Sequence, residues 1–158
     1  MQKHLTGLIA AVHTPMNSDG SLNLSIIEKQ AESLISNGVN GVFVCGTNGE
    51  GLSLTIDERM KVARRWVDVA EKNLNIIIHV GHDCLYDNQA LASHAQEIGA
   101  HAIASVGTSF FKPKDAKSLA DFCAMIADSA PRLPFYYYHI PGLSGVNIPM
   151  IEFLREGQ

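Results

Sequence analysis

The sequence predicts an α/β fold in which parallel strands alternate with helices, and three observations support this prediction. Short runs rich in β-branched residues alternate with stretches whose apolar residues recur every three or four positions. Of the 158 residues, 46% are hydrophobic and 18% are charged, which is typical of a globular domain with one core. Glycines stand where the first and third helices are expected to end. We therefore expect residues 1–158 to form a single domain.

Each strand is expected to lead into a helix. The first helix is marked by apolar residues between positions 27 and 35, and Gly38 ends it. The second begins at Thr55-Ile56-Asp57-Glu58, whose spacing is that of a capping box. The expected strands are 8–12, 42–45, 76–80, 102–106 and 135–138, and the expected helices lie around 27–35, 55–70, 91–98, 119–126 and 148–155.

This alternation is compatible with two folds. Five units in 158 residues would complete a five-stranded, doubly wound, flavodoxin-like sheet. A (β/α)8 TIM barrel typically needs about 250 residues, so the chain would then hold about the first five of its eight βα units. Length and periodicity leave both possibilities open.

Composition excludes several classes of function. Lys and Arg number 12 against 16 Asp and Glu, a net charge of −4, and no basic run is longer than Arg64-Arg65, which disfavours nucleic acid and anionic membranes as partners. No apolar stretch is long enough to span a bilayer, and the amino terminus contains no signal-peptide core. Cys45, Cys84 and Cys123 form no paired motif, so we expect them to be reduced and mostly buried. These features predict a cytoplasmic protein.

The segment Cys45-Gly46-Thr47-Asn48-Gly49-Glu50-Gly51 follows directly on the second expected strand. Unpaired amides in such a turn point at anions. The spacing of Gly46 and Gly51 imitates a phosphate-binding P-loop, but Leu52-Ser53 stands where Lys-Ser/Thr is required, so we expect no ATP site. Two interpretations remain open: a tight turn that needs glycine for its backbone, and a carboxylate or phosphate site that uses Thr47.

A second candidate is the aromatic segment that starts at Phe135. Because side chains alternate along a strand, Tyr136 and Tyr138 are expected to share one face. Tyr138 stands at the carboxyl end, where (β/α)8 enzymes keep their catalytic groups, and a phenol there can relay a proton. The alternative is an aromatic core followed by a turn at Pro141-Gly142.

Metal and hydrolase sites are not supported by the residue pattern. His79, His82 and Cys84 are close in sequence, but their offsets at a strand end do not converge on one ion without further ligands. No Ser-His-Asp order and no paired carboxylates with supporting context are found. We expect no metal and no cofactor.

Taken together, the two candidate motifs resemble the hallmark segments of the N-acetylneuraminate lyase and dihydrodipicolinate synthase family of class I aldolases. These segments are Gly46-Thr47-Asn48-Gly49-Glu50 and Tyr138-His139-Ile140-Pro141. The opening segment 8–15 also resembles the first strand of the family. Leu143-Ser144-Gly145 is closer to the sialic-acid lyases of animal type than to the synthases, which usually carry a Ser-Arg-Thr-Gly run there.

The resemblance implies a TIM barrel, a homotetramer and a cofactor-free reaction. In that reaction a lysine amine forms a Schiff base with the ketone of open-chain sialic acid, and the C3–C4 bond breaks to give pyruvate and N-acetylmannosamine. By the same resemblance, Thr47 and the amides of Thr47 and Asn48 would hold the pyruvyl carboxylate, and Tyr138 would relay the proton.

Three departures from the family pattern matter. The Schiff-base lysine of the family lies on the sixth strand, which these five units do not include. Asn48 replaces a second hydroxyl residue that is common in the loop, and Ser109-Phe110-Phe111-Lys112-Pro113 stands where many relatives present a tyrosine to a neighbouring subunit. None of the lysines is expected at the carboxyl end of an inner strand: Lys3, Lys29, Lys61, Lys72, Lys112, Lys114 and Lys117.

Three functional expectations follow. The first is an N-acetylneuraminate lyase of which this chain is an amino-terminal part, inactive by itself. The second is a related pyruvate-dependent aldolase, similar to dihydrodipicolinate synthase, with another aldehyde specificity. The third is a short, non-catalytic product that associates with full-length subunits, because an unclosed parallel sheet would leave its edges uncovered.

Overall fold

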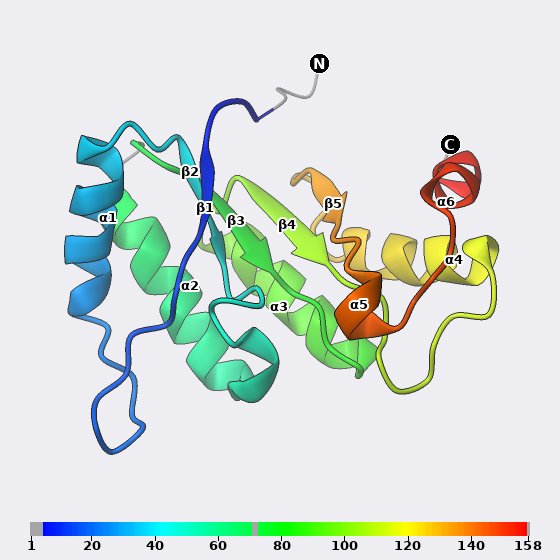
Figure 1. The fold of residues 1–158 in the computed structure, drawn as a ribbon, viewed down its shortest axis with the longest axis horizontal. Helices are drawn as coiled ribbons and strands as arrows, with labels where there is room; N and C mark the ends of the chain where they lie inside the picture. Colours follow the sequence, from blue (N-terminus) through cyan, green and yellow to red (C-terminus); the bar gives the residue numbers. More distant parts are fainter. Residues whose placement is uncertain (1–4, 71–72, 158) are drawn as a thin grey trace.

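The computed structural model describes residues 5–70 and 73–157, which form one five-stranded parallel sheet with helices (Figure 1). The strands are β1 Ile9–Ala11, β2 Gly41–Val44, β3 Asn75–His79, β4 Ala102–Ser105 and β5 Phe135–Tyr137. The helices are α1 Ile26–Ser36, α2 Ile56–Ala70, α3 Leu85–Glu97, α4 Ala116–Ala127, α5 Pro141–Ser144 and α6 Met150–Glu156, with a 3-10 turn η1 at Gly51–Ser53. No helix in the described ranges is long and apolar enough to cross a membrane.

The five expected strands and five expected helices are all present, and α5 is an addition. The expected turn at Pro141-Gly142 is instead the start of this four-residue helix, which ends at Gly145 with a left-handed φ of 67°. So short a helix shows no apolar periodicity in the sequence, which explains why it was not predicted.

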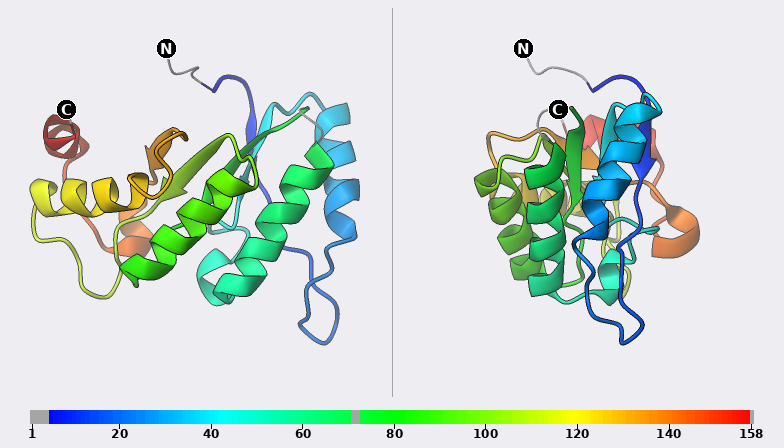
Figure 2. Two further views of the ribbon diagram at one scale, coloured as in Figure 1. Left: turned by 180° about the vertical axis from the view of Figure 1, so that it is seen from behind. Right: turned by 90° about the vertical axis from the view of Figure 1, so that its left-hand side faces the viewer.

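The strand order settles the choice between the two folds. The strands lie in the order β1-β2-β3-β4-β5, and every neighbouring pair is parallel. Right-handed crossovers in this order place all connecting helices on one face, and Figure 2 shows α1, α2, α3 and α4 side by side across that face. A doubly wound sheet reverses its order and has helices on both faces. The doubly wound alternative is therefore wrong, and the chain forms five consecutive βα units of a (β/α)8 barrel.

The two faces of the sheet are buried to different extents. On the outer face, residues such as Val42, Ile76 and Ile103 pack with the helices into the main core, at whose centre the Trp66 side chain is fully buried. On the inner face, Ile77, Ala102 and Ala104 form a separate small cluster against Phe43. Ile9 and Tyr136 on the outermost strands keep 37% and 38% of their surface exposed.

Capping residues fix where α2 begins. The Thr55 amide donates to Glu58 Oε2 at 2.8 Å and the Glu58 amide donates to Thr55 Oγ1 at 3.2 Å, which confirms the predicted capping box. The Thr55 hydroxyl also donates to Glu58 Oε2 at 2.8 Å, and the hydrogen bonds from the Thr55 amide and hydroxyl lower the pKa of Glu58. The start of α2 is thereby fixed beside the carboxyl end of β2, where the candidate site lies.

Candidate active site

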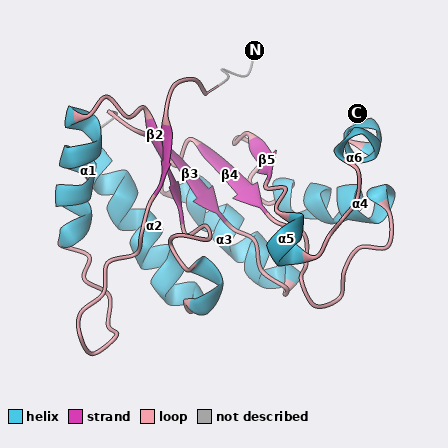
Figure 3. Cartoon of the chain, in the orientation of Figure 1, coloured by secondary structure: helices cyan, strands magenta, loops and turns pink. Residues whose placement is uncertain are grey.

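A cavity lies at the carboxyl ends of the strands, and β3 and β4 both point toward α5, which borders it (Figure 3). Its walls come from the segments that follow four strands and from α5. They include Thr47 after β2, His79 at the end of β3, Val106 after β4 and Tyr138 after β5. Catalytic groups of (β/α)8 enzymes occupy this end of the sheet, so the cavity is the candidate active site.

The loop after β2 has an unusual backbone that exposes its amides. Cys45 and Glu50 take left-handed conformations, with φ of 57° and 50°, which are sparsely populated by residues other than glycine. A Cβ on Gly51 would stand 1.9 Å from the Cys45 carbonyl oxygen, so this position requires glycine. Among the described residues, no acceptor is found for the amides of Thr47 and Asn48. The loop therefore presents two free donors, as an anion site does.

Thr47 and Tyr138 are 91 positions apart in the sequence and meet in the cavity. Thr47 Oγ1 lies 3.2 Å from the Tyr138 hydroxyl, within hydrogen-bonding distance. The Tyr138 amide donates to the Ser105 carbonyl at 2.8 Å, and the Tyr138 ring packs edge-on against Phe43 and His79 at centroid distances of 5.3 and 6.0 Å. The phenol is thus held on both sides, next to the free amides.

Asn48 is oriented toward β1 rather than toward Tyr138. Its side-chain amide donates to the Ala11 carbonyl at 3.3 Å, and its own carbonyl accepts from His13 Nδ1 at 3.1 Å. The Thr14 hydroxyl donates to the Gly49 carbonyl at 2.7 Å. The segment after β1 therefore anchors the loop, and what Asn48 leaves free for a ligand is its backbone amide.

His79 bonds to the first residue of the loop, and Arg59 bonds to the backbone carbonyls of His79 and Gly81. This supporting role was not predicted for either residue. His79 is 4% exposed, and its Nδ1 lies 3.1 Å from the Cys45 carbonyl. Because a carbonyl only accepts, Nδ1 carries the proton. Burial and the charge of Arg59 lower the pKa of His79 to about 3, so the ring is neutral. A signal for Arg59 existed: it stands three and seven positions before Val62 and Trp66, on the apolar face of α2.

The rings of His79 and His82 bond to different backbone groups. The Cys84 amide donates to His82 Nδ1 at 3.0 Å, while the ring of His79 bonds to the Cys45 carbonyl. Within residues 5–70 and 73–157, no group of three or more His, Cys, Asp or Glu could hold a metal ion. The three cysteines are free, with Cys84 exposed and the other two buried.

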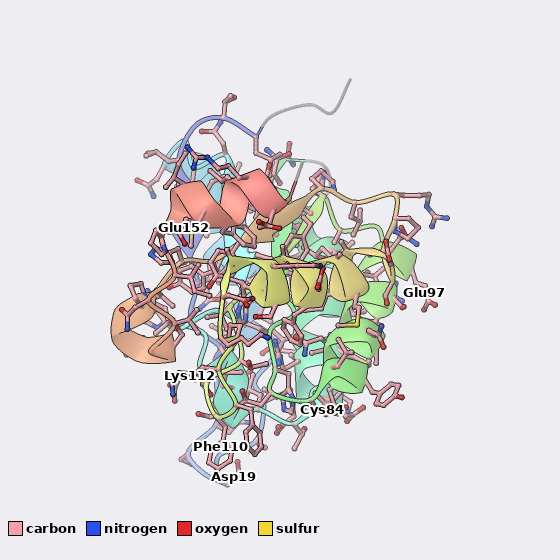
Figure 4. All side chains as sticks on the ribbon, turned by 90° about the vertical axis from the view of Figure 1, so that its right-hand side faces the viewer. Asp19, Cys84, Glu97, Phe110, Lys112 and Glu152 are labelled. Carbon is pink, nitrogen blue, oxygen red and sulfur yellow. The ribbon has the colours of Figure 1, made fainter. Side chains whose placement is uncertain are left out.

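Asp83 fixes the loop between β4 and α4. Its carboxylate accepts hydrogen bonds from the Ser109 amide at 2.6 Å, the Ser109 hydroxyl at 2.8 Å and the Phe110 amide at 3.3 Å. Burial works to raise the pKa of Asp83, but these hydrogen bonds outweigh it and lower the pKa. Beyond this clamp, Phe110 and Phe111 are 77% and 84% exposed, and Figure 4 shows Phe110 and Lys112 on this loop.

Among the described residues, no lysine lines the cavity. Lys3 and Lys72, which were also considered as amine nucleophiles, lie outside the described residues. An amine nucleophile, if the site uses one, must therefore be supplied by residues other than those that line the cavity in this structure.

Comparison with known proteins agrees with this geometry. The dihydrodipicolinate synthetase family matches residues 4–155. The N-acetylneuraminate lyase of Gallus gallus is 47% identical over 155 residues, which are 97% of this chain and 50% of that protein. The structure of the Proteus mirabilis N-acetylneuraminate lyase superposes with a TM-score of 0.95 at 43% identity, covering 98% of this chain and 52% of the other. A catalytic lysine mutant of the Ruminococcus gnavus sialic acid aldolase gives a TM-score of 0.87 at 30% identity, covering 95% and 49%.

The fold and these likenesses define the class of fold: five consecutive βα units of a TIM barrel, as in the solved lyase and aldolase structures that the chain matches. The chain belongs to the dihydrodipicolinate synthetase family. It spans about half the length of the curated relatives that it matches.

Proposed function

We propose that this chain provides the amino-terminal half of the active site of an N-acetylneuraminate lyase, which cleaves sialic acid into N-acetylmannosamine and pyruvate. The observation that carries this proposal is the approach of Thr47 Oγ1 to the Tyr138 hydroxyl, 3.2 Å apart and beside two free amides. The likeness to N-acetylneuraminate lyases at 43% and 47% identity favours this substrate over that of another pyruvate aldolase.

The loop after β2 is proposed to bind the carboxylate of the substrate. The amides of Thr47 and Asn48 and the Thr47 hydroxyl can together donate three hydrogen bonds to one carboxylate, a charge-assisted arrangement about twice as strong as neutral hydrogen bonds. Such binding holds the neighbouring ketone near the Tyr138 hydroxyl. Orientation of this kind lowers the barrier because the reacting groups no longer have to be brought together.

Tyr138 is proposed to move protons during cleavage. A lysine amine, contributed from outside the described cavity, adds to the ketone with loss of water and forms an iminium ion. The Tyr138 oxygen takes the proton of the C4 hydroxyl as its own proton passes to the substrate carboxylate, while the C3–C4 electron pair moves toward the iminium and leaves an enamine. Protonation of C3 and addition of water then release pyruvate and free the amine. The hydrogen-bonding distance between the Tyr138 hydroxyl and Thr47 Oγ1 supports this proposed role.

The assembly and location follow as parts of the proposal. The half-exposed inner-face residues Ile9 and Tyr136 fit a sheet that further βα units cover. They fit equally the alternative of a short chain that associates with full-length subunits without catalysis. A homotetramer and a cytoplasmic location complete the proposal, and the free, mostly buried cysteines fit a reducing compartment.

The test is a hybrid in which residues 1–155 are joined to the part of the Proteus mirabilis lyase that follows its matched region. We expect the hybrid to release pyruvate from sialic acid. We expect Tyr138→Phe in the same hybrid to lower kcat by about 10²–10⁴-fold, the usual contribution of general acid–base catalysis. A hybrid that melts cooperatively and yet releases no pyruvate would contradict the proposal. Association without catalysis would instead appear as co-purification of the 158-residue chain with the complete Proteus lyase.

A further inference from the structure

Arg59 is a buried cation without an acidic partner among the described residues. Its side chain is on α2, and the residue is 1% exposed. Nη1 donates to the Gly81 carbonyl at 3.0 Å and Nη2 donates to the His79 carbonyl at 2.7 Å. Within the described part of the chain, no carboxylate forms an ion pair with it. Burial lowers the pKa of Arg59, yet a guanidinium keeps its charge in proteins.

No described carboxylate contacts Arg59: Asp87 raises the pKa of Arg59 through its charge, but it lies beyond ion-pair distance. Burial raises the pKa of the Cys45 thiol to about 11, although the nearby guanidinium opposes this shift, so the thiol is neutral. The His79 ring is neutral as well. Both carbonyls that accept from Arg59 stand at the end of β3, and Cys45 begins the loop after β2. The guanidinium also lies within hydrogen-bonding reach of the Cys45 side chain, so the positive charge is next to the first residue of the loop that contains Thr47 and Asn48.

A purely structural role does not account for a charge at this position. Removing a cation from water without a counter-charge costs several kcal/mol. A neutral side chain with an amide donor could bond the same strand-end carbonyls without that cost. The property that only a charged residue adds is a positive potential at the loop, and the groups best placed to use it are the two free amides in front.

We propose that Arg59 is a positioning residue for anionic ligands: its charge, acting from behind residues 45–50, favours binding of a carboxylate by the amides of Thr47 and Asn48. This inference rests on the proposed function, because it concerns the same carboxylate. Attraction between a buried cation and an anion through a partly buried site should strengthen binding of the anion by roughly tenfold. A neutral ligand of similar shape gains nothing from it.

The test compares a charged and a neutral probe on the full 158-residue chain. Pyruvate and hydroxyacetone are titrated by NMR into the wild type, Arg59→Gln, Arg59→Lys and the control Arg64→Gln, which removes an exposed charge from the same helix. We expect Arg59→Gln to weaken pyruvate by roughly tenfold and to leave hydroxyacetone within about twofold. The affinities of Arg59→Lys and Arg64→Gln for both probes should stay within about threefold of those of the wild type. Arg59→Lys keeps the buried charge, and Arg64→Gln removes only a charge that solvent screens.

Each other outcome overturns the inference in a recognisable way. If Arg59→Gln weakens both probes equally, Arg59 only supports the loop. If it weakens neither, the charge is irrelevant while the carboxylate site stands. If the wild type shows no pyruvate binding, the proposed carboxylate site itself fails. If Arg59→Gln does not fold, Arg59→Lys decides, because loss of pyruvate binding in a folded Arg59→Lys variant would show that charge is not what matters.

Discussion

Acid should destabilise this fold through His79. The ring is buried at the end of β3, and its pKa falls from 6.5 to about 3 because burial and the charge of Arg59 both disfavour the imidazolium ion. In the unfolded chain the same ring titrates near 6.5. Between these two values the unfolded chain binds a proton that the folded chain does not, so stability falls as the pH falls.

The size of this effect follows from the two pKa values. At pH 5 the unfolded ring is almost fully protonated, which costs the folded state about 2 kcal/mol, since 1.5 pH units below 6.5 correspond to about 1.36 kcal/mol each. The loss reaches about 5 kcal/mol near pH 3, the end of the window. A loss of about 2 kcal/mol is a large part of the total stability of a typical domain.

Urea unfolding at pH 8 and pH 5 measures the effect. The His79→Gln variant does not titrate and keeps an amide donor for the Cys45 carbonyl, so its loss between the two pH values should be about 2 kcal/mol smaller than that of the wild type. His139→Gln is the control, because the His139 side chain is exposed on the surface. Equal losses in the wild type and in His79→Gln would refute the reasoning.

Three further substitutions probe the loop, the core and a helix end. Gly51→Ala places a Cβ 1.9 Å from the Cys45 carbonyl oxygen, so it should lower the free energy of unfolding by about 1–3 kcal/mol and abolish pyruvate binding. Urea unfolding and NMR titration test this. Unchanged pyruvate affinity would count against the described loop. Trp66→Ala empties a fully buried site and should lower the free energy of unfolding by about 3–5 kcal/mol in urea, whereas a loss below about 1 kcal/mol would contradict the described core. Asp115→Ala removes the side chain that accepts a hydrogen bond from the Ser118 amide at 2.8 Å, so it should lower the free energy of unfolding in urea by about 1 kcal/mol. Asp121→Ala, at an exposed position of the same helix, is the control.

The strands were predictable from the sequence because each is a short, mostly apolar run next to a segment with helical periodicity. The register was not: that Phe43 faces Ile77 across β2 and β3 depends on how the whole sheet packs. Periodicity also left the barrel and the doubly wound sheet equally possible. Strand order decided between them, and it depends on contacts between residues far apart in the chain.

The site was predictable in part. Thr47 and Tyr138 could be singled out because both follow strands whose carboxyl ends meet at one edge of a parallel sheet, but their separation of 3.2 Å could not be read from the sequence. Asn48 was expected to act through its backbone amide, and the bond of its side chain to the Ala11 carbonyl could not be read from the sequence. Arg59 was overlooked, although its spacing from Val62 and Trp66 places it on the apolar face of α2.

The central claim is that the loop after β2 and Tyr138 together bind and process the pyruvyl part of the substrate. The measurement that tests it most directly is a crystal structure of the hybrid with pyruvate bound. The account predicts one carboxylate within hydrogen-bonding distance of Thr47 Oγ1 and of the amides of Thr47 and Asn48, with the Tyr138 hydroxyl facing the reacting carbons. Pyruvate bound elsewhere in the barrel, with these donors facing only water, would contradict the account.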